Sequence, residues 1–197
     1  MNVERPRPSP AEVAAARGKP VPDIVAPGLR VLFCGINPSL YSAAVGHHFA
    51  RPGNRFWPAL HGAGFTDRLL SPFEDALLLD FGLGCTNLAP RATARADELD
   101  ARELRAGAER VRDLALRVQP EWLAVLGVTA YRAAFGRFRA ATGPQPEAIG
   151  GTRVWLLPNP SGLNAHYQLP DLVAEYRRLR LADAGGAKCI DTCPNRR

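Results

Sequence analysis

Val31-Leu32-Phe33-Cys34-Gly35-Ile36-Asn37-Pro38 is an apolar run that ends in a turn carrying a carboxamide. Because Pro38 disfavours helical backbone at the residue before it, Asn37 is pushed toward an extended conformation and its side chain is held in place. Open α/β sheets bind their ligands outside the carboxyl ends of strands, where the chain turns toward the next helix. The stretch therefore predicts a buried strand with a candidate site residue, Asn37, at its exit.

A second segment repeats this design near the C-terminus. Leu156-Leu157-Pro158-Asn159-Pro160-Ser161-Gly162-Leu163-Asn164 is again an apolar strand followed by an Asn-Pro turn with small residues. Two such turns after two strands predict a single site that has one turn on each side.

Strand and helix patterns alternate along the rest of the chain. Strands are expected at 30–36, 84–88, 121–126 and 153–157. Helices are expected at 55–60 after a cap at Asn54, at 71–79, at 101–118 after a cap at Asp100, at 129–135 and at 170–181. Residues 89–97 and 143–151 are expected to be loops. This alternation predicts an α/β fold with a mainly parallel sheet that is covered on both faces.

Size and composition predict one soluble domain. The chain has 197 residues, of which 46% are hydrophobic and 22% charged, and it lacks an apolar run long enough to span a membrane. We expect a flexible N-terminal arm at 1–21, a single domain at 22–183 and a frayed tail at 184–197. No signal pattern opens the chain, so the expected location is cytoplasmic. The net charge of +6 favours a polyanionic partner, although a solvated arginine-rich surface is an equally good explanation.

The four cysteines do not predict a metal site. Cys34 and Cys85 lie in apolar strand patterns, which is typical of small buried side chains, and Cys189 and Cys193 form a C-x₃-C pair in a polar tail. This spacing matches no strong metal template. We expect no metal and no cofactor.

Six segments together resemble a known family. They occur in register as Pro22–Val31, Gly35–Pro38, Gly46–Phe49, Pro52–Trp57, Gly84–Leu88 and Asn159–Leu163. Over residues 22–181 the chain resembles the mismatch-specific uracil-DNA glycosylases, the bacterial relatives of thymine-DNA glycosylase. The resemblance implies a three-layer α/β/α sandwich. It also implies a monofunctional, monomeric enzyme that acts on double-stranded DNA. The enzyme would excise uracil, and lesions such as ethenocytosine, that lie opposite guanine. Binding to DNA would place the protein at the nucleoid.

The same resemblance implies roles for individual residues. In such proteins the Asn of the first turn, here Asn37, positions the attacking water, and an aromatic side chain, here Phe49, stacks on the flipped base. The base pocket is assigned to Gly35, Ile36, Ser42, His47 and Phe49. The second turn supplies a wedge that enters the duplex, and it is assigned to Asn159, Ser161, Gly162, Leu163 and Asn164.

The residues agree with this chemistry, with some departures. A neutral amide orients water but is not a strong base, so the expected enzyme is slow.

Asp80 is the carboxylate nearest the strand leading to Thr86. Two roles are possible for it: assistance to Asn37, or a position at a helix end or on the surface. Ser39 stands where the family often carries Gly, and Asn164-Ala165-His166 lacks an Arg that bacterial relatives often place there. The pair His47-His48 looks like the thymine-processing branch, which makes thymine opposite guanine an expected minor substrate.

Other interpretations stay open at this point. Asn37 alone is compatible with a helix cap or a turn brace, and Phe49 with ordinary core. A nucleotide-binding α/β module without glycosylase chemistry is the first alternative, although the first turn lacks the G-x-G-x-x-G and Walker patterns. A protein that binds mismatches or damage without cutting is the second.

Overall fold

The computed structural model describes residues 7–186, which are built around a five-stranded sheet. The strand order is β2-β1-β3-β5-β4, and all neighbouring pairs are parallel except the edge strand β4, which runs antiparallel to β5. The strands are β1 (Val31–Gly35), β2 (Leu83–Asn87), β3 (Trp122–Leu126), β4 (Gly143–Ile149) and β5 (Thr152–Leu157). The mainly parallel sheet predicted from the sequence is confirmed.

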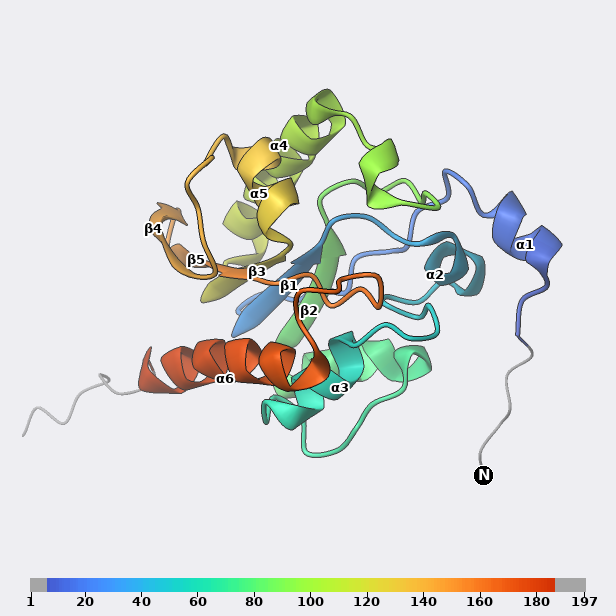
Figure 1. Cartoon of the computed structure of the whole chain (residues 1–197). Coiled ribbons are helices and arrows are strands. Elements are labelled where there is room, and N and C mark those ends of the chain that lie inside the picture. The colour runs from blue at the N-terminus through green and yellow to red at the C-terminus, as the bar shows by residue number, and fades with distance from the viewer. Residues whose placement is uncertain (1–6, 187–197) are drawn as a thin grey trace, which may run out of the picture.

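Helices cover both faces of the sheet (Figure 1). One face carries α4 (Ala101–Val118) and α5 (Val128–Phe135). The opposite face carries α3 (Phe56–Gly62), the 3₁₀ segment η1 (Pro72–Phe81) and α6 (Leu169–Gly186). The result is the α/β/α sandwich that the resemblance implied.

The first strand is apolar throughout because each of its faces meets a different core. Phe33 points toward α3 and α6, where its ring meets Phe56 edge-on at 5.4 Å between centroids. Leu32 and Cys34 point the other way, into the core under α4 and α5. Successive side chains of a strand alternate between faces, so two buried faces require an unbroken apolar run.

The N-terminal segment differs from the expected flexible arm. A capping box between Ser9 and Glu12 starts helix α1 (Pro10–Ala15), and the chain then packs onto the domain. Ala16 and Val21 are buried in a small cluster that they form with two other alanines, Ala43 of helix α2 (Leu40–Val45) and Ala92. Residues 9–21 thus include a helix and buried contacts that the sequence did not predict, because small side chains do not produce a strong apolar pattern. Helix α2 was not predicted.

Two further expectations are corrected. Residues 143–149 form the edge strand β4 instead of a loop, and this edge tolerates Pro144 and Pro146, which cannot donate backbone hydrogen bonds. Helix α6 continues to Gly186 and so includes the start of the expected tail. Residues 187–197, with Cys189 and Cys193, lie outside the described part of the chain.

The described residues contain neither a membrane-spanning helix nor a metal-binding cluster. No helix between residues 7 and 186 is long and apolar enough to cross a bilayer. In the same range, no three His, Cys, Asp or Glu side chains are grouped to hold a metal ion. Cys34 and Cys85 are buried free thiols, and burial raises the pKa of Cys34 to about 12.

Candidate active site

The carboxyl ends of the four parallel strands surround one cavity of about 670 Å³. Gly35 ends β1, Asn87 ends β2 and Leu126 ends β3, and all three line this cavity. Asn159, two residues beyond β5, closes the other side. The two Asn-Pro turns are thus brought together at one site, as the sequence predicted.

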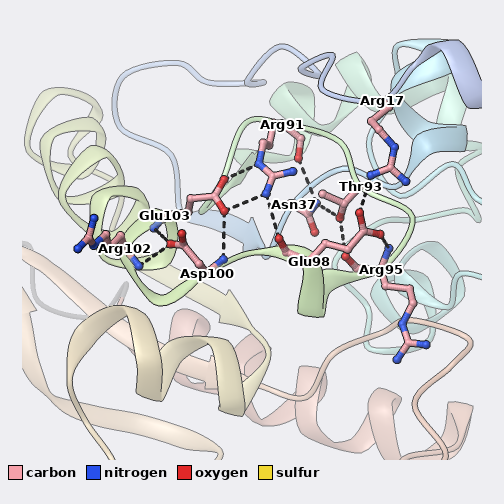
Figure 2. Close-up of polar contacts among 9 residues, drawn as sticks. All are labelled: Arg17, Asn37, Arg91, Thr93, Arg95, Glu98, Asp100, Arg102 and Glu103. Carbon is pink, nitrogen blue, oxygen red and sulfur yellow. Dashed lines mark hydrogen bonds and ion pairs between the residues drawn. The ribbon is translucent and has the colours of Figure 1, made fainter.

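The carboxamide of Asn37 is fixed by two hydrogen bonds from its nitrogen (Figure 2). Its Nδ2 donates to the carbonyl oxygen of Arg91 at 3.1 Å and to Oγ1 of Thr93 at 2.7 Å. A carbonyl only accepts, and the hydroxyl of Thr93 donates its own hydrogen to the carbonyl of Arg95, so both contacts require the amide nitrogen. Oδ1 of Asn37 forms no hydrogen bond within residues 7–186, which leaves this acceptor for a water molecule.

Phe49 offers an aromatic surface beside Asn37. It lines the cavity and stacks on Phe56 with ring centroids 4.1 Å apart and planes inclined by 24°. Its backbone adopts a left-handed conformation, φ 53°, which is strained for a bulky side chain and often marks functional sites. A Cβ at Gly35 would lie 3.3 Å from two ring atoms of Phe49, so glycine is what allows this close approach.

A buried histidine orients a second carboxamide in the wall. Nε2 of His48 lies 2.9 Å from the carbonyl of Pro22, so this nitrogen carries the proton of a neutral ring. Burial lowers the pKa of His48, which favours this neutral form. Its Nδ1 therefore accepts from Nδ2 of Asn87 at 3.5 Å, while Oδ1 of Asn87 lies over Gly35. Asn87 is a cavity-lining residue that the sequence did not predict, and His48 was considered only as one of the pair His47-His48.

His47 does not line the cavity, whereas its neighbour His48 does. Nδ1 of His47 lies 2.9 Å from the buried carboxylate of Asp75, which also accepts from the backbone N–H of His48 at 3.0 Å. The ring of His47 meets Phe73 edge-on. His47 therefore helps to anchor the loop that carries Phe49.

Ser42 and Ile36 lie where they were predicted, in the cavity wall. Ser42 is nevertheless a structural residue as well, because its Oγ accepts from the backbone N–H of Ala50 at 3.0 Å and contacts Oγ of Ser39. Ser39 caps α2 by accepting from the backbone of Ser42. The serine at position 39 is thus the residue that caps the next helix.

The second turn is held by Arg55, which the sequence did not single out. The guanidinium donates to three carbonyls of this loop, those of Ser161, Asn164 and Tyr167, with the last two at 3.0 and 2.6 Å. The loop also lies against the turn before α3, where a Cβ at Gly162 would stand 2.7 Å from the carbonyl of Gly53.

Leu163, on this braced loop, is 71% exposed at the mouth of the cavity. Asn159, Ser161 and Asn164 line the cavity too, and Nδ2 of Asn164 donates to the carbonyl of Asn159 at 2.9 Å. A rigid loop that presents an exposed apolar tip has the form of a wedge.

Asp80 is not brought to the site. It is exposed at the end of η1, before the amino end of β2, whereas the cavity lies at the carboxyl end of that strand. A chemical role beside Asn37 is therefore not supported, and the surface position is the one observed. Among the described residues that line the cavity, Asp97 carries the one carboxylate. Its Oδ2 lies 2.6 Å from Nη2 of Arg95 at the exposed rim.

The geometry combines a fixed amide acceptor, an aromatic face and an apolar tip around one open cavity. Such a site can orient water beside a planar ring that enters from solvent. The family model that matches residues 22–181 has the description Uracil DNA glycosylase superfamily. Members of this superfamily are DNA glycosylases, which hydrolyse N-glycosyl bonds. With most of its length matched, the chain belongs to the uracil DNA glycosylase superfamily.

Proposed function

We propose that the protein is a mismatch-specific member of its superfamily, a monofunctional glycosylase that excises uracil from opposite guanine in double-stranded DNA. Related lesions such as ethenocytosine, and thymine as a minor substrate, belong to the same proposal. The observation that carries it is the carboxamide of Asn37, which lines the cavity beside Phe49 and is fixed through Nδ2, while its Oδ1 makes no hydrogen bond within residues 7–186.

The exposed tip of the second turn favours a duplex substrate. An enzyme that acts on a base in a duplex must swing that base out of the stack, which costs a few kcal/mol and least at weak pairs such as G·U. Leu163 is apolar and exposed beside the cavity, so it is suited to fill the vacated space. Arg51 at the rim supplies positive charge for the DNA backbone.

The proposed hydrolysis uses Phe49, Asn87 and Asn37, which all line the cavity. The flipped pyrimidine stacks on Phe49, and the amide of Asn87 faces its polar edge. Oδ1 of Asn37 accepts a hydrogen bond from the attacking water and directs its oxygen toward the sugar carbon. Positive charge develops on the sugar and negative charge on the departing uracil. The N-glycosidic bond breaks as the water oxygen bonds to the sugar carbon, and the proton of the water passes, through solvent, to the uracil anion. Because an amide does not take up this proton, catalysis rests on positioning and on uracil being a fair leaving group. No cofactor takes part in this proposal.

The direct test uses end-labelled oligonucleotides that carry uracil opposite guanine, uracil opposite adenine or uracil in a single strand. After incubation with the protein, alkali converts abasic sites into strand breaks. We expect breaks in the G·U duplex at a higher rate than in the other two substrates. Binding of the G·U duplex without any breaks would favour a non-catalytic damage-binding protein instead, and neither binding nor breaks would favour a nucleotide-binding module.

The wedge makes a prediction about duplex substrates. Leu163→Ala removes the apolar tip, so we expect excision from the G·U duplex to slow by about tenfold, while excision from single-stranded uracil changes by less than about twofold. Single-turnover rates on the two substrates measure this. Leu181→Ala is the matched control, because Leu181 is 67% exposed on α6 and does not line the cavity. An equal loss on both substrates would contradict a wedge.

Arg55 makes a prediction about the loop that carries the wedge. Arg55→Met removes three hydrogen bonds to carbonyls of residues 161–167 but keeps an apolar stem. We expect faster proteolysis within 160–168 and the same selective loss on duplex DNA as Leu163→Ala, since a mobile loop cannot hold its tip in the stack. Arg132→Met, which removes hydrogen bonds to the carbonyl of Ala140 outside the cavity wall, should leave both measurements unchanged.

A further inference from the structure

The loop between β2 and α4 holds the catalytic amide. This loop, residues 88–100, lines one wall of the cavity with Thr93 to Asp97, and its contacts to Asn37 come from the carbonyl of Arg91 and the hydroxyl of Thr93 (Figure 2). The backbone N–H of Thr93 also donates to the carbonyl of Pro38 at 3.3 Å. The position of the amide therefore depends on the position of this loop.

Arg91 anchors the loop with its side chain while its carbonyl accepts from Asn37. Its guanidinium binds the carboxylate of Glu103 through two nitrogens, Nε to Oε1 and Nη2 to Oε2, the latter at 2.9 Å. Nη2 also donates to the carbonyl of Glu98 at 3.0 Å. One residue thus connects the amide of Asn37 directly to the first turn of α4 (Figure 2).

The helix end of this connection is rigid. Glu103 is the third residue of α4 and belongs to a capping box, in which the backbone N–H of Asp100 donates to Oε2 of Glu103 at 3.0 Å and Oδ1 of Asp100 accepts from the backbone N–H of Glu103 at 2.8 Å. The hydrogen bonds from Arg91 hold the pKa of Glu103 at about 2, so the carboxylate is charged at neutral pH. Helix α4 packs its inner face on the sheet.

A second tether secures the far side of the loop. Oε1 of Glu98 accepts from the backbone N–H of Arg95 at 2.9 Å, and Oε2 of the same carboxylate pairs with Arg17, which follows α1. The carbonyl of Arg95 in turn accepts from Thr93 at 2.6 Å. Both partners of the catalytic amide are therefore fixed from outside the cavity.

We propose that Arg91 and Glu103 are positioning residues that act on the water-directing amide of Asn37 through the β2–α4 loop. The pair is partly exposed, 38% for the Arg91 side chain and 32% for that of Glu103, and exposed ion pairs contribute little to folding stability. Its effect is instead on geometry, because a misplacement of about 1 Å in a catalytic group can slow a reaction by about a hundredfold. The inference rests on the proposed function.

The test is Arg91→Met, which keeps the backbone carbonyl and the length of the side chain but removes the ion pair. We expect the single-turnover rate on a G·U duplex to fall by about tenfold, with affinity for a duplex containing an abasic-site analogue unchanged within about twofold. Arg91→Lys should recover part of the loss, since lysine keeps the charge but not the two-nitrogen contact.

The chain offers a closely matched control in Arg68→Met. Arg68 binds Glu74 through two nitrogens at 3.2 and 2.8 Å, and Glu74 is the third residue of another capping box, with Ser71. This pair is also exposed, and neither member lines the cavity. Arg68→Met should shift the midpoint of thermal unfolding about as much as Arg91→Met but leave the excision rate unchanged.

A double-mutant cycle shows whether Arg91 acts through the amide. In an Asn37→Ala background we expect Arg91→Met to change the rate by less than about twofold, because no amide remains to be positioned. A duplex with 5-fluorouracil opposite guanine, whose base is a better leaving group, keeps the residual rate measurable. The positioning role is overturned by a parental rate in Arg91→Met, by an equal loss in both backgrounds or by an equal loss in Arg68→Met. Absence of excision by the parent protein would instead refute the proposed function.

Discussion

Asn37→Ala is expected to lower the single-turnover rate of uracil excision from a G·U duplex by about a thousandfold, or about 4 kcal/mol of barrier. The alanine has no oxygen to direct water, and the cavity, the ring of Phe49 and the wedge remain in place. Asn37 is partly exposed and makes its hydrogen bonds at the cavity wall, so the substitution should leave the fold intact. Affinity for a duplex with an abasic-site analogue should change by less than about threefold.

The matched control is Asn54→Ala, in which a second cavity-lining asparagine loses its amide. Oδ1 of Asn54 accepts from the backbone N–H of Phe56 at 2.9 Å at the start of α3, so its loss removes a helix-capping contact, typically about 1 kcal/mol. We expect lower thermal stability but a rate within a few-fold of the parent. If Asn37→Ala cleaved the G·U duplex as fast as the parent, the assigned role of Asn37 would be wrong.

Several parts of the fold that local patterns determine were predicted from the sequence, whereas the short helices α1 and α2 were not. The apolar run of β1 and the cap at Asp100 predicted the right strand and the right bounds for α4, because these signals lie within a few residues of the element. The edge strand β4 was missed, since its prolines argue against a strand unless it is known to be at the edge. Its place at the edge is a property of the whole sheet.

Site residues next to a local sequence signal were predicted, and those that depend on contacts between distant parts of the chain were not. Asn37 and the second turn follow strands directly, and the order of strand and turn places them at the site. Thr93 and Asn87 belong to the site through contacts with Asn37 and His48, which lie 56 and 39 positions away in the chain. The ring of His47 contacts Asp75 and the ring of His48 contacts the carbonyl of Pro22, and no local pattern in the sequence distinguishes the two histidines.

Gly35→Ala is expected to lower kcat/KM for uracil excision by about a hundredfold, although it adds a single methyl group. A Cβ at this position would lie 2.5 Å from Oδ1 of Asn87 and 3.3 Å from two ring atoms of Phe49. The ring is stacked on Phe56, and Asn87 is held against His48, so neither can retreat without giving up its contact. The methyl group therefore displaces both surfaces that would receive the flipped base.

Gly151→Ala provides the comparison for this last substitution. Gly151 lies in the turn between β4 and β5, where a Cβ would meet no atom within 4 Å, so both its activity and its stability should match the parent. Gly35→Ala should also destabilise the fold, by about 1–3 kcal/mol for an overpacked site, which thermal unfolding measures. The affinity of folded Gly35→Ala for abasic-site DNA separates loss of the base pocket from loss of the fold. Because binding of abasic-site DNA needs no base pocket, this affinity should persist while excision falls. Parental excision by folded Gly35→Ala would show that the base does not lie between Asn87 and Phe49.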